Sequence, residues 1–267
     1  MRESEPLRLP PAMAQRAREF RGTPAPVRPA ATVVLLRPAD PFEVYVLRRA
    51  GTMVFGGVYA FPGGGVDPSD RPATVKQDWG ERLGVPDEEA RAIVGAAARE
   101  LFEEAGVLLA GTEDATVGDV TGPDWEADRV AVQNRELTMT ELLDRRGFRL
   151  RDDLLFPWSR WITPEFEPKR FDTRFFVALL PEAQTARNVS GEADAAAWIS
   201  PQAANGLALL PPTRSTLDDL CAYDGIPAVV AAASRRNAAA PVRPRVERTE
   251  DGGAVLRIED QPNRPVM

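Results

Sequence analysis

Three glutamates, Glu100, Glu103 and Glu104, are the residues whose types and spacing best suit chemistry in this sequence. On a helix of 3.6 residues per turn, positions i, i+3 and i+4 lie within about 100° of arc. Like charges at these spacings repel by roughly 0.2–0.5 kcal/mol per pair. The negative end of the helix dipole adds to that penalty near a helix C-terminus. Because a divalent cation would reverse both penalties, the pattern favours a metal site over a solvated acidic face.

A glycine-rich segment, Phe61-Pro62-Gly63-Gly64-Gly65, is the second feature with chemical potential. Glycine tolerates positive φ and lets backbone carbonyls and amides approach a ligand closely. A glycine triplet is by itself a common turn. Its partnership with the glutamate helix is what makes it specific.

The sequence contains no histidine and one cysteine, Cys221. These counts exclude Ser-His-Asp and Cys-His catalysis, ordinary zinc sites and an intrachain disulfide. A metal must therefore be held by oxygen ligands, which suit Mg²⁺ or Mn²⁺. The formal charge of −7 disfavours a nucleic-acid partner but allows a small anionic substrate that local arginines or a metal neutralise.

No apolar run approaches the roughly 20 residues of a membrane span, and no apolar segment of the signal-peptide kind opens the chain. We therefore predict a cytoplasmic protein without a membrane partner. A homodimer is compatible with the sequence.

The elements that must position the glutamates are predicted from apolar periodicity and end signals. Residues 1–30 are expected to be an N-terminal extension and 31–267 one domain, with insertions near 67–85 and 111–135 and a C-terminal helical and hairpin addition. A helix is expected from Asp87, as its N-cap, to about Ala105, with Gly106 as its stop. Residues 111–135 are expected to be irregular. Strands are predicted at 31–37, 43–49, 58–61, 154–162, 171–180 and 195–199. Helices are predicted at 137–146, 201–206, 213–223 and 227–236. A hairpin is predicted from 242–250 and 254–259.

The segment Arg99–Val107 (REUxEExGU, with U apolar) resembles the core of the Nudix box, and Phe61–Gly64 resembles the glycine turn that precedes it. The resemblance implies a Nudix-type α/β/α sandwich with a mixed sheet, here with additional C-terminal helices. It also implies metal-dependent cleavage of a diphosphate linkage. By position, the metal ligands would be Glu100, Glu103, Glu104 and a backbone carbonyl at Gly64, and Arg99 would be a structural clamp.

The box departs from the family pattern in its length. Gly64 and Arg99 are 35 positions apart, well beyond the usual spacing, and Arg91 stands where the box has a loop-bracing glutamate. Val44–Asp70 resembles the segment before the box in the coenzyme A diphosphatase-like branch, some members of which have an interrupted box. The sequence leaves the partner of Arg99 open.

Three functions are compatible with these residues: a coenzyme A or acyl-CoA diphosphatase, a hydrolase of NDP-sugars or dinucleotides, and a non-catalytic Nudix-fold nucleotide sensor. A carboxylate would take the proton from water, and the candidates are Glu103 and Glu192. Guanidinium groups match phosphate oxygens, so the substrate-binding candidates are Arg48, Arg49 and Arg174.

Overall fold

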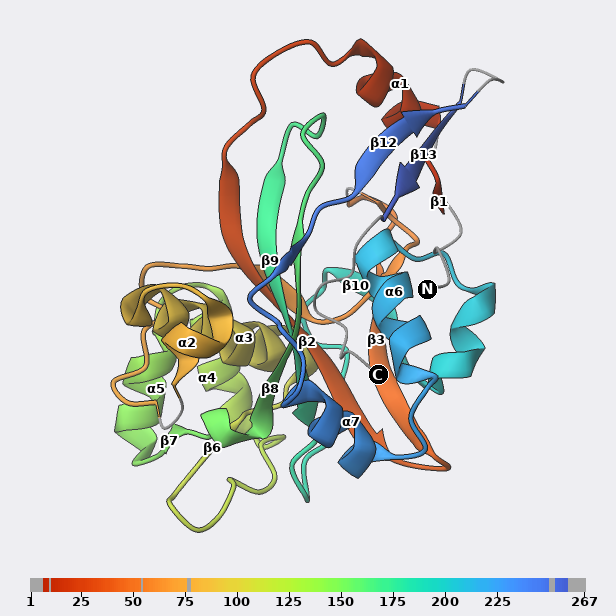
Figure 1. Cartoon of the computed structure of the whole chain (residues 1–267). Helices are drawn as coiled ribbons and strands as arrows, with labels where there is room; N and C mark the ends of the chain where they lie inside the picture. Colours follow the sequence, from red (N-terminus) through yellow and green to blue (C-terminus); the bar gives the residue numbers. More distant parts are fainter. Residues whose placement is uncertain (1–6, 10, 54, 76–77, 250–252, 259–267) are drawn as a thin grey trace.

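The computed structural model describes residues 7–9, 11–53, 55–75, 78–249 and 253–258. Its centre is a mixed sheet in the order β10-β3-β2-β9-β8-β11, with β4 paired to β3 and β5 to β2 (Figure 1). The pairs β2–β9 and β8–β11 are parallel, and the remaining pairs are antiparallel. The strands are β2 (Val27–Pro38), β3 (Phe42–Arg49), β4 (Tyr59–Ala60), β5 (Gly63–Gly65), β8 (Leu155–Ile162), β9 (Arg170–Leu179), β10 (Ala193–Ile199) and β11 (Pro241–Val242).

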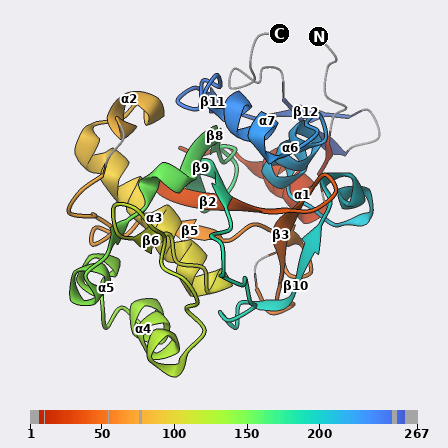
Figure 2. The same ribbon diagram turned by 90° about the horizontal axis from the view of Figure 1, so that it is seen from below.

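Helices cover both faces of this sheet (Figure 2). Strand β2 supplies both cores, because successive side chains of a strand point to opposite faces. Val33 and Leu35 join the core beneath α3 (Asp87–Ala105). Val34 and Leu36 join the core beneath α6 (Pro211–Leu220) and α7 (Ile226–Ala233). The α/β/α sandwich with a mixed sheet is confirmed.

Helix α3 carries the glutamates and matches the prediction closely. Pro86 is its N-cap and Asp87 its first residue, so the cap lies one position earlier than predicted. Gly106 ends the helix in the left-handed conformation, with φ 64°, as expected of a glycine stop. Small side chains such as Ala90 and Ala97 are fully buried, so the helix packs closely on the sheet.

The segments that lengthen the chain around the box are more ordered than predicted. Residues 67–85 include α2 (Trp79–Leu83), which packs on α3. The irregular interpretation of 111–135 is wrong, because α4 (Pro123–Gln133) forms there, with Pro123 at a position where its missing N–H has no consequence. Around these segments the chain forms α5 (Met139–Arg146) and the short strands β6 (Ala110–Gly111) and β7 (Arg149–Leu150), which pair with each other. Two 3₁₀ turns, η1 (Asp152–Leu154) and η2 (Pro201–Gly206), precede β8 and follow β10 respectively.

The described parts of the two chain ends form one small sheet in the order β1-β13-β12. Its strands are β1 (Leu7–Arg8), β12 (Arg245–Arg248) and β13 (Ala254–Arg257), and α1 (Pro11–Glu19) packs against it. The predicted C-terminal hairpin is therefore present. Residues 251 and 252 of its predicted turn, 251–253, lie outside the described residues.

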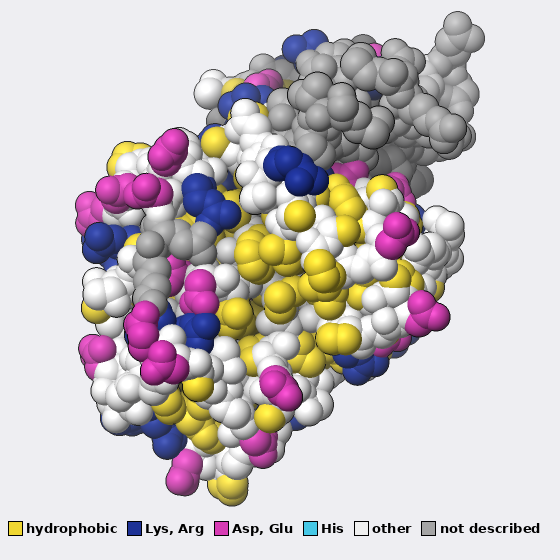
Figure 3. Space-filling model, turned by 60° about the horizontal axis from the view of Figure 1, so that its bottom comes forward, with side chains coloured by type: hydrophobic (Ala, Val, Ile, Leu, Met, Phe, Trp, Pro, Cys, Tyr) yellow, Lys and Arg dark blue, Asp and Glu magenta, His cyan; other side chains and the backbone are white. Residues whose placement is uncertain are grey.

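Among the described residues, no helix combines the length and the apolar character needed to cross a membrane. Figure 3 shows hydrophobic side chains gathered near the middle of one face, with acidic and basic side chains mostly towards its margin.

Candidate active site

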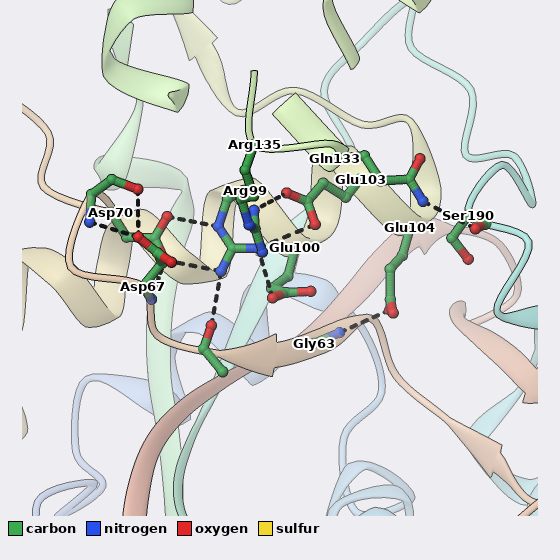
Figure 4. A network of polar contacts seen from close by, with 12 residues as sticks. Gly63, Asp67, Asp70, Arg99, Glu100, Glu103, Glu104, Gln133, Arg135 and Ser190 are labelled. Carbon is green, nitrogen blue, oxygen red and sulfur yellow. Dashed lines mark hydrogen bonds and ion pairs between the residues drawn. The ribbon is translucent and has the colours of Figure 1, made fainter. Parts of the chain in front are cut away.

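The glycine segment and the glutamate helix meet, as predicted. Residues Gly63–Gly65 form a strand rather than a turn, pairing with β2. The Gly63 amide donates to Glu104 Oε2 at 3.0 Å (Figure 4). A Cβ added to Gly64 would lie 2.5 Å from Glu100 Oε1, so that carboxylate rests against bare backbone. A Cβ added to Gly63 would lie 2.5 Å from the Ala31 carbonyl oxygen, so the pairing of this strand with β2 also requires glycine.

Arg99 is the buried clamp of the site, and Asp70 is its partner. Its Nε and Nη2 donate to the two Asp70 carboxylate oxygens at 2.6 and 2.9 Å. Nη2 also donates to the Gly65 carbonyl at 2.8 Å. Nη1 reaches Glu100 at 2.7 Å and Glu103 at 3.1 Å. The guanidinium therefore joins the loop, the glycine strand and the helix in one ion-pair network.

Asp70 takes the place of the loop-bracing glutamate that the sequence lacks. Arg91 is exposed on α3 itself, about 12 Å along the axis from Arg99 at 1.5 Å per residue, and cannot brace the loop. Asp70 is the last residue of the sequence F-P-G-G-x-x-D-P-x-D, which begins at Phe61 beside the glycine strand. That motif was the available signal for this residue, and our sequence interpretation missed it.

Burial and mutual repulsion perturb the two inner carboxylates. The pKa of Glu104 is raised to about 8, chiefly by burial and also by the charges of Glu100 and Glu192, against the opposing effects of Gly63 and Arg49. Burial likewise raises the pKa of Glu100 to about 7, opposed chiefly by Arg99. Buried acids that resist ionisation are characteristic of functional sites.

Glu103 is arranged differently from its two neighbours. Arg99 holds one of its oxygens, and Arg135 Nη1 donates to the other at 2.5 Å. Consequently the described residues include no group of three acidic, His or Cys side chains placed to hold a metal ion. The assignment of Glu100, Glu103, Glu104 and the Gly64 carbonyl as metal ligands stays a prediction.

The three arginines predicted to bind substrate lie in three different environments. Arg48 is exposed at the strand edge and donates to Asp194 at 2.6 Å. Arg49 lies near enough to Glu104 to lower its pKa. Arg174 as a substrate ligand is wrong, because its side chain is 2% exposed and bonds Asp172 and the Leu83 carbonyl. The alternation of β9 turns Arg174 into the covered face of the sheet.

The downstream acid Glu192 lies beside the site in the exposed loop before β10. Its charge contributes to the raised pKa of Glu104. Its carbonyl accepts from the Ala50 amide at 2.9 Å, and its own amide donates to Ser190 Oγ at 3.2 Å. These contacts hold the loop near the glutamates.

Helix α4 brings further polar residues that the sequence interpretation missed. Arg129 Nη1 donates to the Glu103 carbonyl at 3.0 Å and to Gln133 Oε1 at 3.0 Å. Gln133 Nε2 in turn donates to the Ser190 carbonyl at 3.0 Å. The helix thereby ties the end of α3 to the loop that carries Glu192. No periodic signal in the segment pointed to this role.

Tyr45 is a second missed residue. Its side chain is buried on β3, and among the described residues its hydroxyl has no hydrogen-bond partner. Burial raises the pKa of Tyr45 to about 12, with a further contribution from Glu104. The Tyr45 phenol therefore stays protonated at neutral pH, next to the negative charge of Glu104.

Comparison with known proteins agrees with this geometry. Residues 72–208 match the family described as the NUDT19 Nudix domain. The chain is 30% identical over 161 residues to a Caenorhabditis elegans protein named putative nudix hydrolase 7. That match covers 60% of this chain and 47% of the relative, so it spans about half of the relative's length.

A solved structure gives the broader match. The crystal structure of a Nudix hydrolase from Alicyclobacillus acidocaldarius is 30% identical, with a TM-score of 0.61 over 78% of this chain and 96% of that chain. The chain belongs to the Nudix hydrolase family.

Nudix hydrolases generally use divalent metal ions, and the chemistry of this site can be compared with that need. Glu100 is buried and Glu104 is half-buried, and both have a raised pKa. Glu100 lies against the backbone of Gly64, and Glu104 accepts from the Gly63 amide. Carboxylate and carbonyl oxygens are the ligands that suit Mg²⁺ and Mn²⁺. These two residues fit such an ion, whereas Glu103 is held by two guanidinium groups.

Proposed function

We propose that this protein is a metal-dependent pyrophosphohydrolase that cleaves the diphosphate linkage of a nucleoside diphosphate derivative. The observation that carries the proposal is the network of Arg99 and Asp70, which holds the glycine strand against the box glutamates of a Nudix fold. Such a network orders acidic side chains that would otherwise repel one another.

In the proposed reaction, Glu100, Glu104 and a backbone carbonyl near Gly64 would hold Mg²⁺ or Mn²⁺. A bound divalent ion neutralises the diphosphate and lowers the pKa of the attacking water. Arg99 fixes the glutamates before substrate arrives, so little reorganisation accompanies the reaction. Glu192 takes the proton from water, and Glu103 is the second candidate for that role.

The proposed substrate class is coenzyme A or an acyl-CoA, from the resemblance of Val44–Asp70 to that branch. Arg49, and Arg48 after exchange of its Asp194 contact, would bind substrate phosphates. NDP-sugars and dinucleotides are the alternative substrates.

A non-catalytic nucleotide sensor is the second candidate function. It is favoured by one observation: Glu103 is engaged by Arg99 and Arg135, and the described acids form no three-residue metal group. A sensor would bind nucleotide without turnover.

The cytoplasmic location, the homodimer and the division into a 1–30 extension and a 31–267 Nudix domain likewise stay predictions.

The test is a substrate panel of coenzyme A, acyl-CoA, NDP-sugars and dinucleotides, incubated with Mg²⁺ or Mn²⁺ and analysed by mass. We expect one product pair in which each product keeps one phosphate of the cleaved linkage, so that coenzyme A gives 4′-phosphopantetheine and a nucleoside phosphate. Tight binding of a panel member, without products in either metal, would establish the sensor instead.

A further inference from the structure

Arg135 has an unusual backbone for its residue type. It follows α4 with φ 63°, in the left-handed region that favours glycine. Three other helices of this chain, α2, α3 and α5, end with glycine in the same conformation, at Gly84, Gly106 and Gly147. Helix α4 therefore carries a side chain at a position where a side chain is disfavoured, which points to a use for that side chain.

The side chain of Arg135 reaches the candidate active site. Its Nη1 donates to Glu103 Oε1 at 2.5 Å, and the side chain is 46% exposed (Figure 4). Its charge also lowers the pKa of Asp67 in the neighbouring loop, after the larger effect of Ser69. Nη1 is the atom bonded to Glu103, and the 46% exposure of the side chain leaves part of the guanidinium open to solvent beside the glutamates.

Two other arginines, whose side chains donate hydrogen bonds to the box, are committed to the protein. Arg99 is 2% exposed and makes contacts with Asp70, Gly65 and two glutamates. Arg129 is buried and binds Glu126 and the Glu103 carbonyl. Neither has an exposed edge to offer a ligand. A polyanionic substrate that approaches an acidic cluster nevertheless needs positive charge at the point of contact.

We propose that Arg135 is a substrate-binding residue that grips a phosphate of the diphosphate through its Nε–Nη2 edge while Nη1 stays on Glu103. This inference rests on the proposed function and assigns one contact within it. The planar guanidinium fork suits two phosphate oxygens at once. The bond to Glu103 fixes its direction, so the phosphate is placed next to the box.

The experiment measures binding of methylenediphosphonate, a non-hydrolysable diphosphate, by calorimetry at saturating Mg²⁺. The variants are Arg135→Gln, which removes the charge, and Arg135→Gly, which also relieves the backbone. Arg135→Lys keeps the charge without the fork. Arg91→Gln is the matched control, because it removes one exposed positive charge from α3.

We expect the dissociation constant to rise about 10- to 100-fold in the Gln and Gly variants, as for loss of a hydrogen bond to a charged group. The Lys variant should lie between them and wild type, and Arg91→Gln should match wild type. The melting temperature of Arg135→Gly should equal or exceed that of wild type, since the left-handed position no longer carries a side chain. With substrate, KM should rise more than kcat falls.

If Arg135→Gln binds diphosphonate with the affinity of wild type, the inference is overturned. The same holds if the variant changes only the affinity for Mn²⁺ and leaves that for diphosphonate unchanged. A wild-type enzyme that turns over no substrate, yet needs Arg135 for diphosphonate, would sink the catalytic proposal and leave this contact standing. If wild type turns over substrate normally and diphosphonate binding does not depend on Arg135, the catalytic proposal stands and the Arg135 contact is refuted.

Discussion

Replacement of Asp70 by asparagine removes the partner of Arg99 with little change in shape. The side chains of Asp70 and Arg99 are 1% and 2% exposed, so water cannot take over the lost contacts. Asparagine keeps an acceptor at Oδ1 but presents an NH₂ group at the Oδ2 position. There it faces two donors, Arg99 Nη2 at 2.9 Å and the Asp67 amide at 2.8 Å.

The magnitude follows from those two contacts. A hydrogen bond to a charged group contributes roughly 1.5–3 kcal/mol, and an unsatisfied buried amide costs about 1 kcal/mol or more. Because Arg99 keeps three other acceptors, the loss should be near the lower part of the 3–5 kcal/mol range for breaking a buried ion pair. We expect Asp70→Asn to lower the free energy of unfolding by about 3 kcal/mol.

Urea denaturation followed by tryptophan fluorescence measures this loss. With a slope of about 3 kcal/mol per molar urea for a chain of this size, the midpoint should fall by about 1 M. Glu88→Gln is the control, because it breaks the exposed Arg71–Glu88 pair and should leave the midpoint nearly unchanged. If Asp70→Asn behaves like that control, the clamp has been assigned to the wrong residue.

Three further outcomes are expected. Activity should vanish in EDTA and return with Mg²⁺ or Mn²⁺ but not with physiological Zn²⁺, because the ligands are oxygens; full turnover in chelator would refute the mechanism. Glu104→Gln should lower kcat at least about 100-fold in steady-state assays with metal. Since burial raises the pKa of Glu104 to about 8, the contribution of its protonated form to stability is lost as pH rises from about 5 to 8. Metal-free melts of wild type should show that loss, and the Gln variant should show less of it; parallel melting curves would contradict the assignment. Gly64→Ala should reduce kcat while the protein stays folded, because its Cβ would lie 2.5 Å from Glu100 Oε1; wild-type kinetics would show that the carboxylate moves freely.

The sequence alone was enough to predict the elements whose signals lie close together along the chain. Helix α3 follows from its acidic first turn, its small buried residues and its glycine stop, all within one segment. The meeting of Gly63 with Glu104 across 41 positions was also predictable, since the box motif relates the two elements. Loop closure over such a length adds only about 0.8 kcal/mol relative to a short link.

What escaped prediction depends on tertiary contacts that no local pattern encodes. The Asp70–Arg99 pair joins residues 29 positions apart, across a segment that also folds into α2. Arg174 was misassigned because its charge suggested a ligand while the pleat of β9 buries it. Arg135 becomes informative only through its dihedral angle, which a sequence of letters does not display.

The small sheet of β1, β12 and β13 makes the two chain ends thermodynamically dependent on each other. Leu7 pairs with Leu256, and the same apolar cluster includes Met13 from α1 and Phe166 from the loop between β8 and β9. Removal of β1 and α1 therefore takes one pairing partner from β13 and uncovers Phe166, and loss of β13 leaves β1 without the strand it pairs with. An affinity tag that needs an extended, unpaired terminus would likewise disturb an element more than 200 positions away along the chain.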